Sequence, residues 1–186
     1  MQASIASTVF DSSFTIASWF EVKGSGLTGN SPVFSVEATY AGGNYTNGSY
    51  IALGFRNHAG SVVLHNGNGI ATAHTVSVLD SNWHLFVLDY DPSDGSYNLY
   101  LDGSLLGSGT RTKFRSPTGS IRFFGGGFYD TSDHVDGGQN VRVWSRALSS
   151  SEVSSLYSDP WIGSDYTAVV PPSNRFFSPA AFARLG

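Results

Sequence analysis

Short segments in which apolar and polar residues alternate recur along this 186-residue chain. In the segment FTIASWFEV (14–22), Phe14, Ile16 and Phe20 lie on one side, a pattern typical of a half-buried β-strand. Further segments of strand length, separated by clusters of Gly, Asn and Asp that indicate turns, lie at 33–40, 50–55, 61–65, 74–79, 83–90, 97–103, 120–129 and 139–145. Because no helix separates these segments, the pattern predicts an all-β fold, an antiparallel two-sheet sandwich.

A single short helix is predicted after the last strand, in the sequence RALSSSEVSSLYSDP. Ser149 and Glu152 have the spacing of a capping box, which satisfies backbone amides at a helix start. Val153 and Leu156 lie on one side of this helix, and Pro160 ends it because proline has no amide hydrogen. A helix this short is marginal in water, so we expect it to pack against the sandwich.

Composition narrows the functional classes. A net charge of -4, a pI of about 5.6 and the lack of a basic cluster argue against a nucleic-acid-binding face. The chain has no Cys, so it has neither a disulfide framework nor a thiolate zinc site. We expect no membrane insertion and no signal peptide, because the sequence lacks a run of about 18 apolar residues and the regions of a leader.

Three segments carry a resemblance to a known family: FTIASWFEV, NWHLFVLDYDPSDGSYNLYLDGSLLGSG and VRVWSRALSSSEVSSLY. They resemble the concanavalin A-like, laminin-G-like jelly-roll domains. In that family a Trp-containing strand opens the domain, a W-H…Y-D…L-Y-x-D-G hairpin forms its middle and an R-A-L-S-x-x-E…L-Y helix closes it. The resemblance covers roughly residues 10–160. It implies a jelly roll of two curved antiparallel sheets, with the short C-terminal helix at the edge of the sandwich.

The segment LYSDPWIG, at the end of this helix, is similar to laminin-G-like domains of bacteriophage structural proteins, such as head-decoration and tail proteins. This resemblance implies a component of the virion surface, extracellular after host lysis, whose partners are other virion proteins or copies of the same chain. A second hypothesis is a carbohydrate-binding lectin module that acts as an adhesin on cell-surface glycans. The two hypotheses are not exclusive, and both stay open.

We expect residues 1–163 to form the domain and residues 164–186 to form an extended tail. The tail has three Phe residues, which a free disordered segment rarely carries. It either folds back over its own sandwich or serves as an assembly arm on a neighbouring subunit or virion surface. The residues that would bind a partner are Trp161, Arg175, Phe176, Phe177, Phe182 and Arg184.

The sequence predicts no catalytic residues. Glycoside hydrolases on this type of fold need a pair of nearby carboxylates, but the three Glu residues lie in separate segments. Asp89 and Asp91 alternate at a strand end before Pro92, and we interpret them as turn residues rather than as catalytic acids. No G-x-S-x-G, H-E-x-x-H or Walker motif occurs, so we expect a protein that is not an enzyme.

The loop YDTSDHVDGG gathers three carboxylates, Asp130, Asp133 and Asp136, beside His134. Calcium takes several oxygen ligands, and the laminin-G-like resemblance implies calcium sites at the rim of the sandwich, so this loop is the candidate metal site. The alternative is a solvated turn, in which His134 forms hydrogen bonds and binds neither metal nor ligand. No other cofactor is expected.

The loop YAGGNYTNGSY is the candidate glycan-binding site. Tyr45 and Tyr50 could stack on a sugar ring, while the amides of Asn44 and Asn47 bind its hydroxyls. The alternative is a flexible connection between two strands, and both interpretations stay open.

Overall fold

The computed structural model describes residues 2–4, 7–21, 31–37, 50–56, 61–65, 70–76, 78, 80–110, 120–123 and 137–159. In chain order, the elements that these residues form are β1 (Gln2–Ser4), the 3-10 helix η1 (Ser7–Phe10), β2 (Phe14–Glu21), β3 (Ser31–Glu37), β4 (Tyr50–Arg56), β5 (Ser61–His65), β6 (Ile70–Thr75), β7 (Trp83–Tyr90), β8 (Ser96–Leu101), β9 (Ser104–Thr110), β10 (Ser120–Phe123), β11 (Gly137–Trp144) and α1 (Ser150–Ser158).

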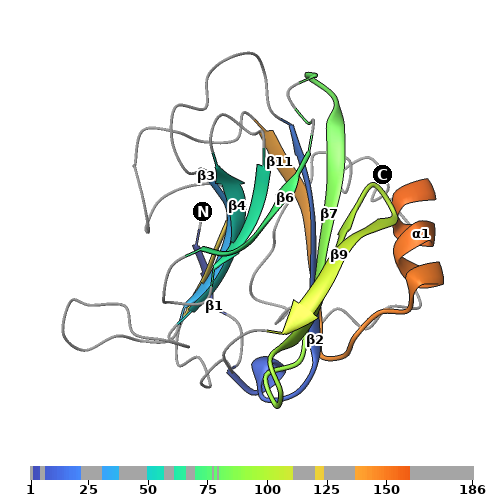
Figure 1. Cartoon of the computed structure of the whole chain (residues 1–186). Coiled ribbons are helices and arrows are strands. Elements are labelled where there is room, and N and C mark those ends of the chain that lie inside the picture. The colour runs from blue at the N-terminus through green and yellow to red at the C-terminus, as the bar shows by residue number, and fades with distance from the viewer. Residues whose placement is uncertain are drawn as a thin grey trace, which may run out of the picture.

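The strands form two antiparallel sheets. The first has six strands in the order β1-β10-β3-β4-β5-β6, and the second has five in the order β11-β2-β7-β8-β9. Figure 1 shows the two sheets face to face, with α1 beside the five-stranded sheet on the side away from the other sheet. This arrangement confirms the predicted all-β jelly-roll sandwich with one short helix. The strand predicted at 74–79 instead lies earlier, as β6, because Ile70 pairs with His65 at the end of β5.

The central strand β7 of the five-stranded sheet is buried on both faces, from His84 to Tyr90, whereas no residue of β9 is buried. Side chains that alternate along its strands form the core on the side of the six-stranded sheet: Phe14, Ile16, Phe20, Phe86, Leu88 and Leu99. The opposite, outer face forms a second cluster with α1 and the loop before it, made up of Ala17, Leu85, Val87, Tyr100, Trp144, Leu148, Val153 and Leu156. The helix therefore covers part of the outer face.

Helix α1 begins as the sequence predicts. The Ser149 hydroxyl accepts a hydrogen bond from the Glu152 amide at 3.3 Å, and the Glu152 carboxylate accepts one from the Ser149 amide at 2.8 Å. Val153 and Leu156 are buried against the sheet, and burying side chains of this size contributes roughly 1.5–3 kcal/mol each. None of the helices in the described part of the chain has the length and apolar character needed to cross a membrane.

The hairpin between β8 and β9 turns at Asp102 and Gly103, whose φ angles of 50° and 78° are both positive. A two-residue turn of this kind matches the natural twist of paired strands. Asp102 also binds β7, because its Oδ2 lies 2.8 Å from His84 Nδ1 and its Oδ1 accepts from the Leu85 amide at 2.9 Å. This turn therefore fixes β7, β8 and β9 side by side.

Candidate functional site

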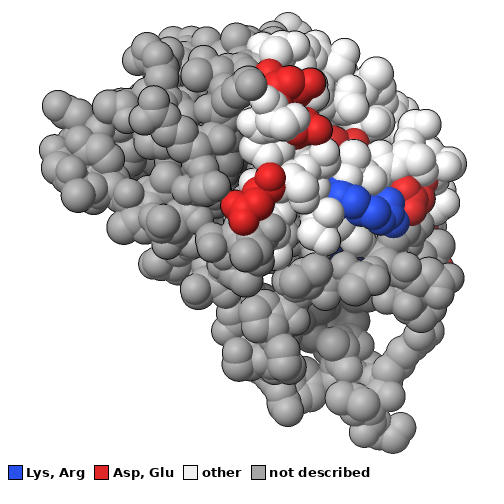
Figure 2. All heavy atoms as spheres, turned by 90° about the horizontal axis from the view of Figure 1, so that it is seen from below, with Lys and Arg blue, Asp and Glu red and all other residues white. Residues whose placement is uncertain are grey.

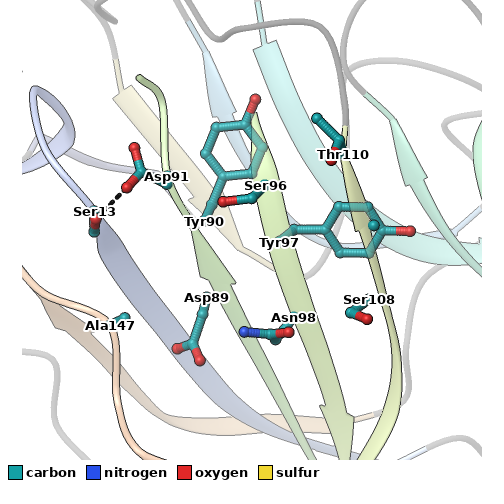
Figure 3. A pocket seen from close by; sticks show the side chains of 11 residues that line it. Ser13, Asp89, Tyr90, Asp91, Ser96, Tyr97, Asn98, Ser108, Thr110 and Ala147 are labelled. Carbon is teal, nitrogen blue, oxygen red and sulfur yellow. Dashed lines mark hydrogen bonds between the residues drawn. The ribbon is translucent and has the colours of Figure 1, made fainter. Parts of the chain in front are cut away.

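A cleft of about 370 Å³ opens on the outer face of the five-stranded sheet, at the end where β7 stops and β8 begins. It lies beside the loop that leads into α1, and Figure 3 shows it from close by. The residues that line it are Ser13, Asp89, Tyr90, Asp91, Ser96, Tyr97, Asn98, Ser108, Gly109, Thr110 and Ala147. Most of these residues are polar, in contrast to the apolar cluster beneath α1.

Three polar side chains form a row across the cleft. Asp89 of β7 pairs with Asn98 of β8, which pairs with Ser108 of β9, and Figure 3 shows Asn98 between the other two. Side chains on one face of a sheet repeat every second residue along a strand. The row therefore follows directly on Val87 and Tyr100, which belong to the apolar cluster. The outer face thus changes from apolar to polar at the edge of that cluster.

The carboxyl group in this row belongs to Asp89, which is buried: only 3% of the residue is exposed. Its Oδ1 accepts hydrogen bonds from the Thr15 hydroxyl at 2.5 Å and from the Leu148 amide at 3.4 Å. Its Oδ2 is also buried and has no hydrogen-bond partner in the structure. Burial raises the pKa of Asp89, and the hydrogen bonds from Thr15 and Leu148 offset this only in part.

The Thr15 hydroxyl indicates where a proton on Asp89 would lie. The Thr15 oxygen is 2.5 Å from Asp89 Oδ1 and 2.8 Å from the backbone oxygen of Arg146, and both atoms are acceptors when Asp89 is ionised. A hydroxyl has one proton and cannot donate to both at once. A proton on Oδ1 resolves this conflict, because Asp89 then donates to Thr15 and Thr15 donates to Arg146. Asp89 Oδ2 remains an acceptor in that arrangement.

Asp91, the second carboxylate of the cleft, is held by the turn after β7. Its Oδ1 accepts from the Ser93 amide at 2.8 Å and the Ser93 hydroxyl at 2.6 Å, and its Oδ2 accepts from the Ser13 hydroxyl at 2.7 Å. These hydrogen bonds lower the pKa of Asp91 below 3.8, so the group is ionised at neutral pH. The predicted turn role is confirmed for Asp91. It is wrong for Asp89, which lies within β7 and binds Thr15.

The site residues suggested by the sequence lie outside the described residues, with one partial exception. Those outside are Asn44, Tyr45, Asn47, Asp130, Asp133, His134, Asp136, Trp161, Arg175, Phe176, Phe177, Phe182 and Arg184. Tyr50 begins β4, and its backbone pairs with that of Glu37. All of these assignments stay predictions. Within the ranges that the structure describes, no group of three or more His, Cys, Asp or Glu side chains is placed to hold a metal ion.

Asn98 and Ser108 carry no sequence motif, although one sequence signal for the cleft is present. Leu85 and Val87 lie at alternate positions of β7 on the outer face, and Asp89 comes next on that face. A carboxylate that interrupts a buried apolar row requires either a partner or an opening to solvent. That interruption marks the edge of the cleft.

Three of the solved structures with the same fold are described here by their source. A candidate carbohydrate-binding protein from Bacteroides ovatus is 18% identical with a TM-score of 0.59, over 81% of this chain and 42% of that chain. The CBM40 module of the Ruminococcus gnavus IT-sialidase, bound to α2,3-sialyllactose, is 18% identical with a TM-score of 0.60, over 80% and 84% of the two chains. A SAP-like pentraxin from Limulus polyphemus is 17% identical with a TM-score of 0.57, over 78% and 69%.

The chain spans less than half of the Bacteroides ovatus protein and most of the Ruminococcus gnavus module. At these identities the likeness establishes the fold alone. No curated protein matches the sequence significantly. The model of one protein family, described as the concanavalin A-like lectin/glucanases superfamily, matches residues 2–154. This match spans every strand of the two-sheet sandwich and the first half of α1, and the chain therefore belongs to the concanavalin A-like lectin/glucanases superfamily.

Proposed function

We propose that this chain is a non-catalytic carbohydrate-binding module and that the cleft over β7, β8 and β9 holds the sugar. The observation that carries this proposal is Asp89 Oδ2, a buried acceptor that has no hydrogen-bond partner. Leaving such an atom unsatisfied costs about 1–3 kcal/mol. The atom has no exposed surface, so a ligand hydroxyl would recover that free energy once the Asp89 side chain turns toward the cleft that its residue lines.

The row beside Asp89 suits sugar hydroxyls. Each ring hydroxyl of a sugar donates one hydrogen bond and accepts others. The Asn98 amide and the Ser108 hydroxyl can likewise do both. Neighbouring strands lie about 4.8 Å apart, so these groups are spaced on the scale of a sugar ring. Binding sites of this kind combine a concave surface with a few convergent polar groups, and the fold is of the type found in the CBM40 module.

The two carboxyl groups of the cleft support binding rather than hydrolysis. Glycoside hydrolases use one carboxyl group as an acid and a second as a nucleophile or base. Asp91 is unsuited to the second role, because Ser13 and Ser93 already donate to both of its oxygens. We therefore propose Asp89 as the carboxyl group of the cleft that contacts the ligand. Release of sugar by the protein, abolished by the substitution Asp89→Asn, would contradict this part of the proposal.

A blocking substitution in the cleft tests the proposed function. Ser108 is exposed on β9 and lines the cleft, so Ser108→Tyr should fill the cleft without disturbing the core. Ser104 is exposed on the same strand and is not among the lining residues, so Ser104→Tyr is the matched control. We expect a glycan array to identify a bound sugar, and calorimetry to show at least tenfold weaker binding for Ser108→Tyr only. Equal binding by both variants would place the sugar elsewhere.

A structural role in a bacteriophage virion is a second proposal, favoured by the resemblance of the segment LYSDPWIG. In this role the sandwich is an exposed knob and residues 164–186 attach it to other virion proteins or to copies of itself. The two functions are compatible, because the cleft and the tail are separate parts of the sequence. Deleting residues 171–186 should leave glycan binding intact and prevent incorporation into particles. Normal incorporation of the truncated chain would refute the assembly arm.

A further inference from the structure

We infer that sugar binding in the cleft releases a proton from Asp89, so that the affinity for the sugar rises with pH. The free protein holds this proton between Asp89 and Thr15, and the carboxyl group gives it up to the solvent when the side chain turns into the cleft. This inference rests on the proposed function and names how the same site is regulated. The pH of the surroundings then sets how tightly the cleft holds a sugar.

The Asp89 side chain is enclosed in its resting position. Only 3% of the residue is exposed, and Oδ2 has no exposed surface. Oδ1 accepts from the Thr15 hydroxyl at 2.5 Å and from the Leu148 amide at 3.4 Å. A sugar in the cleft therefore reaches this carboxyl group only after the side chain turns, and turning separates Oδ1 from Thr15.

The hydrogen bonds around Thr15 favour a protonated carboxyl group at rest. The Thr15 oxygen accepts from the Leu148 amide at 3.1 Å and lies 2.8 Å from the backbone oxygen of Arg146. With a proton on Oδ1, Asp89 donates to Thr15 and Thr15 donates to Arg146, so each of these hydrogen bonds has its own proton. Without that proton, Asp89 and the Arg146 oxygen compete for the single Thr15 proton.

The charges near Asp89 at rest do not take the place of this proton. Burial raises the pKa of Asp89, and the hydrogen bonds to Oδ1 offset this only in part. The charge of Glu152 raises this pKa and that of Arg146 lowers it, and these two side chains form a pair with Nη2 2.6 Å from Oε1. Figure 2 shows basic side chains directly against acidic ones on one face of the molecule. Tyr100 on the neighbouring strand is neutral, because its pKa is raised above 10.

The cleft offers a turned carboxylate what the resting position lacks, namely water and several donors. Asn98 is the strand partner of Asp89, Ser108 is the next residue in the row, and Figure 3 shows Asn98 between the other two. Contact with water removes the burial that raises the pKa of Asp89. Sugar hydroxyls bind a carboxylate through charge-assisted hydrogen bonds, which are roughly twice as strong as neutral ones. Asp91 is ionised and opposes a second charge, but water in the open cleft weakens that repulsion.

The two positions of Asp89 give the direction of the pH effect. In the free protein its pKa is raised above 3.8, and in the complex it is lower than in the free protein. Between these two values, binding releases up to one proton to the solvent, and the affinity rises by up to about tenfold per pH unit. Above the free-protein value Asp89 is already ionised, so the affinity is highest there and no longer changes with this group.

Calorimetry with the whole chain counts the proton. The probes are methyl β-glucoside, methyl β-galactoside and the glycan that binds best on an array. Each is titrated from pH 4 to pH 8 in two buffers that differ in ionisation enthalpy. At the pH where the affinity changes most steeply, we expect release of about half a proton or more, and a rise of about tenfold or more in affinity across the range.

Two outcomes separate the inference from the proposed function. If a probe binds, Ser108→Tyr abolishes that binding and no proton is released at any pH, the cleft is a sugar site but its coupling to a proton is wrong. If no probe and no glycan on the array binds at all, the proposed function is wrong and this inference is wrong with it.

Two matched substitutions identify the group that releases the proton. In Asp89→Asn the side-chain amide donates to Thr15 as the protonated carboxyl group does, and it cannot ionise. We expect its affinity to be independent of pH from 4 to 8, with no proton released. Asp91→Asn removes the other carboxylate of the cleft and should keep the release. Release that persists in Asp89→Asn, or that is lost only in Asp91→Asn, would overturn the inference.

An NMR titration of the natural sequence measures the same coupling without a substitution. The ¹³C signal of the Asp89 carboxyl group gives its pKa in the free chain and in the chain saturated with the best-binding probe. We expect a pKa about one unit or more lower in the complex, which corresponds to the tenfold change in affinity. An equal or higher pKa in the complex would contradict the release of a proton from Asp89.

Discussion

His84 and Asp89 are both buried polar residues of β7, but their polar atoms are satisfied differently. His84 Nδ1 lies 2.8 Å from Asp102 Oδ2 and its Nε2 lies 3.0 Å from Asp80 Oδ1, so both ring nitrogens have carboxylate partners. Asp89 has partners at Oδ1 and none at Oδ2. A fully satisfied buried group is a structural feature, whereas an unsatisfied one requires an explanation, and for Asp89, whose residue lines the cleft, we propose a ligand. Only Asp89 therefore belongs to the candidate site.

The pH dependence of stability tests the structural role of His84. Burial alone would lower its pKa, but the hydrogen bonds and negative charges of Asp102 and Asp80 outweigh burial and raise the pKa above 6.5. Because the folded-state pKa is raised, this stabilisation is complete below 6.5 and is lost as pH rises through the folded value. We expect His84→Gln to lower the free energy of unfolding by about 1.5–3 kcal/mol at pH 6, and by less at pH 9.

Denaturant unfolding of both proteins at several pH values measures this difference, and an NMR titration of the His84 ring gives its pKa directly. Asp80→Asn serves as a control that removes only part of the network. It removes the more exposed of the two carboxylates that contact His84 and leaves Asp102 in place. Its effect should be smaller than that of His84→Gln. A difference between His84→Gln and the natural sequence that stays constant from pH 6 to pH 9 would contradict the assigned network.

At the scale of elements, local patterns predicted the helix cap and the strands well. The Ser149–Glu152 spacing encodes a capping box that forms within four residues, so tertiary structure is not needed to foresee it. The cleft is different. Its position depends on which part of the outer face α1 covers, and that follows from the packing of Val153 and Leu156 against strands far away in the sequence. Alternation alone could not show that Asn98 and Ser108 lie beyond this cover.

The same distinction between local and long-range contacts explains why the predicted turn role is correct for Asp91 and wrong for Asp89. The turn chemistry of Asp91 is local, because its partner Ser93 is two residues away. The partners of Asp89 are Thr15 and Leu148, which lie 74 and 59 residues away. Sequence proximity made the two residues look like one turn pair. The register of β2 and β7, which pairs Thr15 with Asp89, separates them.

At the scale of the whole molecule, the five-stranded sheet is covered by the second sheet on one face and by α1 on part of the other. This arrangement supplies a core for stability on both sides of β7 and leaves the end of β7, β8 and β9 open for recognition. Members of one fold bind different ligands through local side chains. In this chain we propose that the polar row of Asp89, Asn98 and Ser108 determines which ligand binds.

A crystal structure of the chain with its best-binding sugar tests the central claim most directly. We expect the sugar to lie in the cleft over β7, β8 and β9, with the Asp89 side chain turned toward it and one hydroxyl oxygen about 2.5–3.0 Å from Asp89 Oδ2. Asn98 and Ser108 should contact neighbouring hydroxyls of the same ring. A sugar bound at any other surface, with Asp89 Oδ2 contacted by water alone, would contradict the account.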